Sequence, residues 1–493
     1  MHRSSRSWLA YITLGLAHLL LAGAAGAQSP RAILEATGVK GGLIVHVPCG
    51  DGTLTTALRV NDRFLVHGLD TDAANVAQAR ARAQSLGLHG EATFSVLKGR
   101  RLPFIDNTVN LLVSEGLGGI STREVMRILA PDGVAYVKRN GQWTSTPKPR
   151  PREIDDWTHF LHGPDGNPVA RDSVVGPPFH MQWVGAPSHS KSHSHLASIN
   201  VIVSAGGRIF YFVDEGPTAL PHSLASQWNL VARDAFNGVT LWRRPLSSWQ
   251  PADLSGRNFF PVDLFRRLVT DGQRVYATLS IFGPVVALDP ATGETIRTYE
   301  GTENTEEIIC HEGTLFLVVG TTSPDDIDRR ALAQRRGEPA EQRIMAISAE
   351  TGSVLWEKRG RDTNGVMPMT LAARGRRALF QNTENVICLE ARTGDELWRS
   401  PRPASYARPS WSAPTLVVHD DVVLCADRGA ATAASARTQN RAGQTRSGDL
   451  VVLSAKTGER LWSSPCAEGC RSPIDVFVAN GRVWLGEEMA RKP

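Results

Sequence analysis

The sequence predicts two modules of different fold class, an α/β Rossmann-like module followed by an all-β array of propeller type. At 493 residues the chain is too long for a single compact core. Strand and helix patterns alternate between residues 42 and 137, which is typical of a parallel sheet with crossover helices. In the second half one short motif recurs five times, which is typical of a repeat architecture.

The beginning of the chain has the pattern of a targeting segment. Arg3 and Arg6 precede an apolar run over residues 8–21, and a small-residue cleavage pattern stands before Gln28. We therefore predict that residues 1–27 are a signal peptide and that the protein is exported, to the periplasm or the cell exterior. The apolar run is short for a membrane span, so an uncleaved anchor is the alternative. No later segment is long and apolar enough to span a bilayer.

Composition excludes few classes of function. Charged residues make up 21% of the chain, which is ordinary for a globular protein, and the net charge is only +5. The basic residues are scattered and form no stripe with interleaved aromatic residues. We therefore expect no nucleic-acid binding.

A candidate nucleotide site follows the first strands of the α/β module. The apolar run 43–47 ends at a turn with Gly50 and Gly52, where the backbone can approach a ligand and helix N–H groups can point at it. The next strand ends at Asp70, whose carboxylate can accept hydrogen bonds from both ribose hydroxyls of an adenosine. Thr55 stands where a dinucleotide-binding motif requires its third glycine, which disfavours that class of ligand.

The turn 47–52, Val-Pro-Cys-Gly-Asp-Gly, resembles the first motif of the class I S-adenosylmethionine-dependent methyltransferases. Residues 101–114 and 127–137 are similar to the stretches that lead into the fourth and fifth strands of that family. The resemblance implies a methyltransferase-like Rossmann domain over residues 30–145 and S-adenosylmethionine as its ligand. The cofactor-binding residues that it implies are His46, Cys49, Gly50, Gly52 and Asp70.

Departures from the family pattern bear on activity. His46 stands where the family carries an acid that helps to hold the cofactor's amino group, and Lys98-Gly99 stands where the family often places an acid near the adenine. The last strand pair of the usual fold is expected to be missing after Val137. Export would also remove the protein from the cytosolic supply of the cofactor. Two hypotheses stay open, an active methyltransferase and a retained fold with weak or altered ligand binding.

Five segments of the second half share a strand, a turn with Asn-Gly or Thr-Gly, and a second strand with Trp four residues after the glycine. The glycine is expected to have positive φ, and the Trp to pack between neighbouring blades of a propeller. Arg297 replaces the Trp in one segment, and we expect that position to be exposed or loosely packed. The segments are 232–242, 287–297, 346–356, 388–398 and 452–462.

These repeats resemble the quinoprotein dehydrogenase repeat, shared with the propeller lipoprotein of outer-membrane assembly. The resemblance places the repeats at 191–493 and a linker with an opening strand at 146–190, where residues 156–160 and 182–184 carry its motifs. True dehydrogenases of this type bind pyrroloquinoline quinone with adjacent cysteines and calcium. The chain has no adjacent cysteines, which argues against a quinone-dependent oxidoreductase and favours a scaffold whose face binds protein or polysaccharide.

The repeat array looks unfinished. We count five complete blades and the start of another over residues 476–485, whereas propellers of this type normally close a ring. We therefore expect an incomplete ring, and a fragment and a premature end are both open interpretations.

Three local clusters could carry chemistry. His189, His193 and His195 could share a transition metal, and a polar loop is the alternative. Cys466 and Cys470 are expected to form a loop disulfide. Asp155 and Asp156 beside His159 could form a catalytic group, although turn formation is the commoner use of such carboxylates.

Overall fold

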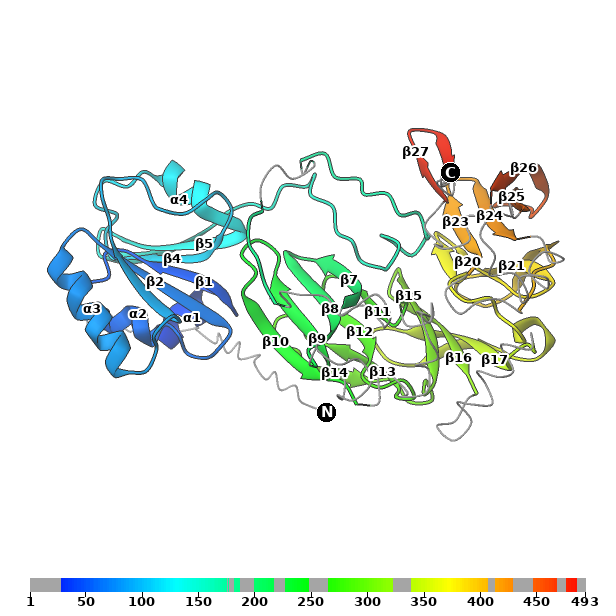
Figure 1. Ribbon diagram of the computed structural model, residues 1–493, viewed down its shortest axis with the longest axis horizontal. Coiled ribbons are helices and arrows are strands. Elements are labelled where there is room, and N and C mark those ends of the chain that lie inside the picture. Colours follow the sequence, from blue (N-terminus) through cyan, green and yellow to red (C-terminus); the bar gives the residue numbers. More distant parts are fainter. Residues whose placement is uncertain are drawn as a thin grey trace, which may run out of the picture.

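The computed structural model describes residues 28–174, 176, 181–186, 199–216, 227–247, 265–321, 338–406, 413–428, 447–467 and 476–485. The predicted signal peptide and the predicted metal ligands His189, His193 and His195 lie outside these residues. The predicted disulfide partner Cys470 does as well. Figure 1 shows an α/β module at one end of the molecule and a fan of β-sheets beside it, which confirms the predicted fold class.

The first module is a six-stranded sheet in the order β3-β2-β1-β4-β5-β6. Its first five strands are parallel, and β6 is antiparallel to β5. The strands are β1 (Gly42–His46), β2 (Phe64–Asp70), β3 (Ala92–Val96), β4 (Val109–Ser114), β5 (Leu129–Arg139) and β6 (Gln142–Pro147). The helices are α1 (Pro30–Thr37), α2 (Thr53–Ala57), α3 (Ala73–Ser85) and α4 (Thr122–Ile128).

The strand β6 corrects in part the expectation that the last strand pair of the fold is missing, because one antiparallel strand of the two follows β5. Asn140 and Gly141 both have positive φ and form the tight turn between the two strands. An Asn-Gly pair is the strongest short signal for a hairpin. The ring of Trp143 then stacks on Tyr136, with centroids 4.8 Å apart.

The second module contains five consecutive four-stranded antiparallel sheets and one two-stranded sheet within the described residues. This confirms the five predicted blades and the start of a sixth. We number the sheets blade 1 to blade 6. Blade 1 consists of β7 (Ile199–Ala205), β8 (Arg208–Asp214), β9 (Trp228–Asp234) and β10 (Thr240–Pro245). Blade 2 consists of β11 (Leu268–Thr270), β12 (Val275–Thr278), β13 (Val285–Leu288) and β14 (Thr295–Thr298).

Blade 3 consists of β15 (Thr305–His311), β16 (Thr314–Gly320), β17 (Gln342–Ser348) and β18 (Val354–Lys358). Blade 4 consists of β19 (Ala372–Arg374), β20 (Arg377–Gln381), β21 (Asn385–Glu390) and β22 (Glu396–Pro401), preceded by the short 3₁₀ helix η4 (Arg361–Thr363). Blade 5 consists of β23 (Thr415–His419), β24 (Val422–Arg428), β25 (Ser447–Ser454) and β26 (Arg460–Ala467). Blade 6 consists of β27 (Val476–Ala479) and β28 (Arg482–Leu485). The first strand of each blade contacts the first strand of the next.

The repeat motif joins neighbouring blades as predicted. The turn glycines all have φ between 72° and 79°. The ring of Trp356 in blade 3 lies against Gly394 in blade 4, so close that an added Cβ would stand 2.7 Å from it. Its indole N–H donates to the carbonyl of Ala391, three residues before that glycine, at 2.9 Å. Trp242 and Trp398 make the same two contacts with blades 2 and 5.

Two positions of the motif differ from the prediction. At the junction of blades 2 and 3, Arg297 replaces Trp, but the junction is not loosely packed. Tyr299 is buried there, and its hydroxyl donates to the carbonyl of Ala349 at 2.7 Å. Trp462 in blade 5 is 45% exposed, whereas Trp356 and Trp398 are 8% and 7% exposed. The expectation that every repeat Trp is buried against a neighbour is therefore wrong for Trp462.

Residues 157–167, which we call the axial segment, correct another expectation. They contain no strand of a blade and instead form hydrogen bonds with the inner strands of all six blades. The main-chain contacts join Trp157 to Ser204, Thr158 to Thr270, Pro164 to Ala373 and Asp165 to Val418. His159 Nε2 accepts from the N–H of Cys310, and the Asn167 side chain bonds both N–H and C=O of Val478. One segment thus connects every blade.

Residues 181–186 also form no strand within the described part of the chain, although a strand was expected there. Trp183 nevertheless acts as a repeat Trp for blade 1. Its ring lies against Gly238, and its indole N–H donates to Ala235 at 2.9 Å. The first blade therefore receives the same contact from the preceding segment that later blades receive from their neighbours.

Candidate functional site

The predicted nucleotide site lies at the carboxyl edge of the parallel sheet, where β1 and β2 end. We call His46, Cys49, Gly50 and Asp70 the ligand edge. Ligands of open α/β sheets bind outside the carboxyl ends of the strands. Gly50 has φ of 54° and no atom within 4 Å of the position of an added Cβ, so there is open space above it.

Asp70 holds the glycine turn in place. Its Oδ2 accepts from the N–H of Gly50 at 2.9 Å, and its Oδ1 accepts from the N–H of Asp72 at the same distance. The side chain is only 4% exposed. Each oxygen has a second lone pair, but a ribose would have to reach a carboxylate that already supports the backbone.

His46 takes the position where the resemblance implies an acid. Its Nδ1 lies 2.8 Å from the hydroxyl of Thr55, while its Nε2 is buried without a partner. Burial lowers the pKa of His46 to about 4, against the opposing effect of Asp70. The imidazole is therefore neutral at pH 7 and supplies no charge. The sequence contains no direct sign of the Thr55 contact, although the spacing of nine residues fits a strand followed by one helical turn.

Cys49 and Gly52 serve packing. Cys49 is buried, and burial together with the charge of Asp70 raises the pKa of its thiol to about 11, so it is not a reactive thiolate. Gly52 has φ of 79°, and an added Cβ would stand 2.7 Å from Ala79 on α3. The glycine thus permits close contact between α2 and α3.

The ligand edge fits the ribose end of S-adenosylmethionine and does not fit its ammonium end. Asp70 and the open space at Gly50 suit a nucleoside. A neutral His46 can form one hydrogen bond but no ion pair with the cofactor's amino group. Pro48 in the turn has no N–H to offer a ligand.

The propeller contacts the opposite edge of the sheet. Asn110, at the start of β4, donates to Asp234 Oδ2 at 2.7 Å and accepts from Asn237 at 2.7 Å, both in blade 1. An added Cβ on Gly41 would stand 2.8 Å from Leu241. These residues lie at the amino ends of β1 and β4, so the propeller leaves the ligand edge uncovered. Sequence reasoning missed Asn110, because a contact across 124 residues has no local signal.

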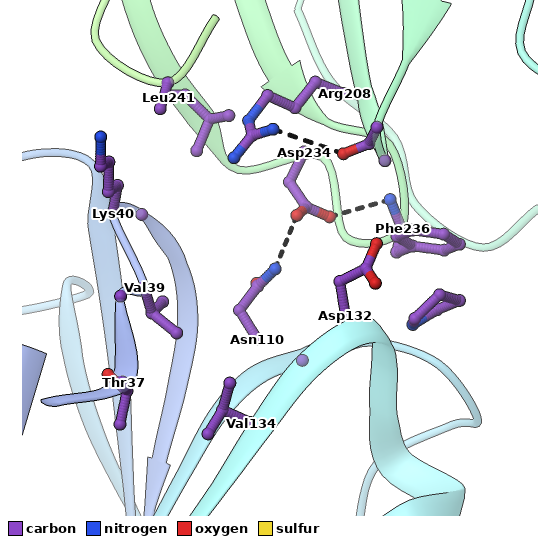
Figure 2. Close-up of a pocket in the computed structure, with 17 residues that line it drawn as sticks. Thr37, Val39, Lys40, Asn110, Asp132, Val134, Arg208, Asp234, Phe236 and Leu241 are labelled. Carbon is purple, nitrogen blue, oxygen red and sulfur yellow. Dashed lines mark hydrogen bonds between the residues drawn. The ribbon is translucent and has the colours of Figure 1, made fainter. Parts of the chain in front are cut away.

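A cavity of about 250 Å³ lies at this contact between the modules. Figure 2 shows Arg208 and Asp234 of blade 1 facing Lys40, Asn110 and Asp132 of the first module. Burial raises the pKa of Asp234 and lowers the pKa of Arg208, opposed in both cases by neighbouring charges of opposite sign. The lining carries both signs of charge beside apolar side chains of the two modules.

A buried ion pair occupies the propeller interior beside the axial segment. Arg266, just before β11, pairs with Glu307 of β15 at 2.5 Å and donates to the carbonyl of Leu371 in front of β19. Glu307 also accepts from the N–H groups of Met369 and Leu371. The cavity beside this pair measures about 20 Å³, which is room enough for one water molecule and too small for a tricyclic quinone.

The acidic cluster of Asp155 and Asp156, just before the axial segment, is also structural. His162 Nε2 lies 2.7 Å from Asp155, while Asp156 pairs with Arg150 at the same distance. His159, which the sequence placed beside these carboxylates, instead bonds the inner strand of blade 3, and burial lowers its pKa to about 3.

Three further features concern the described residues alone. No group of three His, Cys, Asp or Glu side chains among them could hold a metal ion. Their helices are each too short or too polar to cross a membrane. The cysteines Cys49, Cys310, Cys388 and Cys425 are free and buried.

Comparison with known families agrees with both modules. The family model described as "Methyltransferase domain" matches residues 44–133, and the model described as "Outer membrane protein assembly factor BamB" matches residues 229–442 and 338–472. The chain therefore joins a methyltransferase-type domain to BamB-like propeller repeats of the pyrroloquinoline quinone type. No curated protein matches it.

Solved structures resemble either module. BamB from Moraxella catarrhalis is 15% identical with a TM-score of 0.32, and the match covers 55% of this chain and 65% of that one. A protein of Methanococcus maripaludis described as an S-adenosylmethionine-dependent methyltransferase is 24% identical over 22% of this chain and 52% of that one, with a TM-score of 0.21. A methyltransferase of this class from Methanosarcina mazei is 24% identical over 21% and 55%, with a TM-score of 0.19. The chain thus spans about half to two thirds of these structures.

Proposed function

We propose that this protein is a binding scaffold that works outside the cytoplasm, with the propeller as its platform for protein or polysaccharide. The observation that carries the proposal is the axial segment, because one stretch of chain bonds the inner strands of all six blades. The Asn110–Asp234 contact then fixes the first module to blade 1. A platform held in this way presents its surface without an ordering cost on binding.

Two features support a scaffold over catalysis. The neutral His46 leaves the ammonium end of S-adenosylmethionine without an ion pair, and export separates the chain from the cytosolic cofactor. Among the described residues of the propeller, the cavity beside Arg266 measures about 20 Å³ and is too small for a quinone. The pattern before Gln28 supports export.

The test is cosedimentation of the full chain with isolated cell-envelope fractions, compared with a Gly50→Val variant. Valine would fill the open space above the turn and strain its backbone at φ of 54°, and both effects lie away from the propeller. We expect both proteins to be retained equally. Loss of retention in the variant, or transfer of methyl groups from labelled S-adenosylmethionine to envelope material, would contradict the scaffold role. N-terminal sequencing of the exported protein should find Gln28.

An active methyltransferase is the second candidate, favoured by the open space at Gly50 and the unpartnered His46 Nε2. Calorimetry of the full chain with S-adenosylmethionine tests it. The scaffold proposal expects weak or no binding, and a low-micromolar Kd abolished by Gly50→Val would establish the second candidate. A His46→Asp variant, which restores the acid, should bind more tightly than the natural chain if loss of the ion pair weakened this site.

A further inference from the structure

We propose that the cavity between the two modules binds a small zwitterion, a free α-amino acid with an apolar side chain. The cavity measures about 250 Å³ and is lined by residues of both modules, and we call it the intermodule cavity. It lies near the amino ends of β1 and β4, whereas the ligand edge lies at the carboxyl ends of the strands. The inference therefore concerns a second site and goes beyond the proposed scaffold function.

Four charged side chains line the intermodule cavity, and their formal charges cancel. Lys40 and Arg208 are cationic, and Asp132 and Asp234 are anionic. In Figure 2 the two carboxylates lie on one side of the cavity, and the guanidinium group of Arg208 extends toward the side of Lys40. A ligand with a single charge would meet two lining groups of the same sign, whereas a zwitterion can pair with both kinds.

Arg208 has donors available for a ligand. Within the described part of the chain it forms no ion pair, and its one hydrogen bond, to the carbonyl of Gly206, is long at 3.4 Å. Burial lowers the pKa of Arg208, and three neighbouring carboxylates oppose this shift. A guanidinium group carries five N–H donors in a planar fork that matches a carboxylate. Arg208 is therefore the group that would hold the carboxylate of the amino acid.

Asp132 would receive the ammonium group. Its side chain is 61% exposed, and its ion pair with Arg150 spans 3.8 Å, which is too long for a hydrogen bond. Asp234 is less available, because its oxygens already accept three hydrogen bonds from other residues of the chain. Its negative charge still favours an ammonium group in the cavity.

The rest of the lining defines the side chain of the ligand. Val39 and Val134 of the first module and Phe236 and Leu241 of blade 1 supply apolar walls (Figure 2). An apolar side chain would replace water against these walls. The volume is below the about 300–1,000 Å³ of pockets for drug-sized ligands, which fits a molecule of amino-acid size.

The experiment is a calorimetric titration of the full chain with L-leucine and with two analogues that each lack one charge. Isocaproate keeps the carboxylate and the branched carbon chain, and isoamylamine keeps the amine. We expect L-leucine to bind with a Kd below about 1 mM and at least about tenfold more tightly than either analogue, because each analogue leaves lining charges of one sign without a partner. L-Valine and L-phenylalanine are titrated as further probes, and glycine, which has no apolar side chain, should bind more weakly than L-leucine.

Matched variants locate the binding. Arg208→Gln should weaken L-leucine binding at least about tenfold, since it removes the group that pairs with the carboxylate. Arg243→Gln is the control, because Arg243 belongs to the same blade but pairs with Glu215 and does not line the cavity. It should leave the Kd unchanged.

A second variant tests the ammonium side without risk to the fold. Asp132 has φ of 66°, and asparagine tolerates this conformation as well as aspartate does. In Asp132→Asn the lining carries a net positive charge, so isocaproate should bind at least as tightly as L-leucine. A purely structural role of Asp132 would not reverse this preference.

The inference fails if the Kd of L-leucine, L-valine and L-phenylalanine all exceed about 1 mM. It also fails if isocaproate, isoamylamine or glycine binds the natural chain as tightly as L-leucine, because the ligand would then need only one charge or no side chain. Equal affinities of Arg208→Gln and Arg243→Gln, or an unchanged preference in Asp132→Asn, would place the binding outside the intermodule cavity and overturn the inference as well. Envelope material does not enter the titration, so a negative result leaves the scaffold function as it stands.

Discussion

Different side chains close the junction of blades 3 and 4 and the junction of blades 2 and 3. At both junctions a turn glycine is covered and a carbonyl near it accepts a hydrogen bond. Trp356 covers Gly394 with its ring and donates from its indole N–H to Ala391. At the other junction two residues divide these tasks. The stem of Arg297 lies 3.4 Å from the position of an added Cβ on Gly352, and the Tyr299 hydroxyl donates to Ala349.

The comparison shows that the repeat conserves two physical requirements and not one residue type. A side chain of the preceding blade must cover the turn glycine, and a donor must reach the carbonyl three residues before it. A buried carbonyl without a donor is costly, so the second requirement persists when the Trp is replaced. Tyr299 meets it from two residues beyond the motif position.

The largest difference is expected between Trp356, which is buried against the next blade, and Trp462, which is partly exposed. Trp356→Ala should lower the free energy of unfolding by about 3–5 kcal/mol, because it empties a large buried site. Trp462→Ala should change it by less than about 0.5 kcal/mol, as for an exposed side chain. Denaturant melts of the full chain measure both, and equal losses would mean that the Trp contacts do not hold the blades together.

The glycine side of the same junction can be tested with alanine. Gly394→Ala should destabilise by about 2–4 kcal/mol, because alanine disfavours positive φ and its Cβ would overlap Trp356. The control is Gly313→Ala, whose φ of 74° is nearly the same as the 75° of Gly394 but whose surroundings are open. It should cost only about 1–2 kcal/mol. Equal costs would leave the Trp contact without a role.

Acid should loosen blade 3, which takes part in both junctions. His159 bonds the inner strand of this blade, and burial holds its pKa at about 3, below the ordinary 6.5. The unfolded chain therefore binds a proton that the folded chain does not, and this contribution to stability falls as the pH drops below 6.5 and continues to fall until about 3. The slope is up to about 1.4 kcal/mol per pH unit, or about 2 kcal/mol between pH 6.5 and 5. Unfolding curves of His159→Gln should show a shallower slope over this range, and an unchanged slope would assign the effect elsewhere.

Removal of the Tyr299 hydroxyl, the donor at the junction of blades 2 and 3, is expected to change the free energy of unfolding by a smaller amount. Tyr299→Phe keeps the ring and removes the shorter of two hydrogen bonds to the Ala349 carbonyl, which still accepts from Arg274 at 3.3 Å, so it should destabilise by about 1 kcal/mol. Tyr136→Phe is a matched control, because its hydroxyl bonds Gln28 at the edge of the first module. The comparison fails if the two substitutions cost the same in thermal or denaturant melts.

The smallest effect is expected at Arg297 itself. Arg297→Ala removes the stem that covers Gly352 but leaves the Tyr299 hydrogen bond, so the loss should stay below about 1 kcal/mol. The double variant with Tyr299→Phe should then show whether the two tasks are independent. A loss for Arg297→Ala as large as that of Trp356→Ala would show that the arginine alone closes the junction.

The sequence by itself determined the features that neighbouring residues encode. The alternation of strands and helices, the turn glycines with positive φ and the four-residue spacing to Trp each depend on a few consecutive residues, and all are present in the structure. The glycine turn at Gly50 and the strand end at Asp70 were predicted on the same basis, and the structure brings them within hydrogen-bonding distance. The hairpin at Asn140 and Gly141 had an equally local signal, which was overlooked.

Only the tertiary structure decided the rest. The axial segment bonds partners up to 311 residues away, and Asn110 reaches blade 1. Tyr299 of blade 2 donates to blade 3, as an indole N–H does at the other junctions. The burial of His46 and the exposure of Trp462 likewise depend on which elements pack around them. A contact between residues far apart in the chain produces no period or spacing in the sequence. The same residue types also occur in solvent-exposed turns, so only packing decides whether a given residue is buried against a distant partner or exposed.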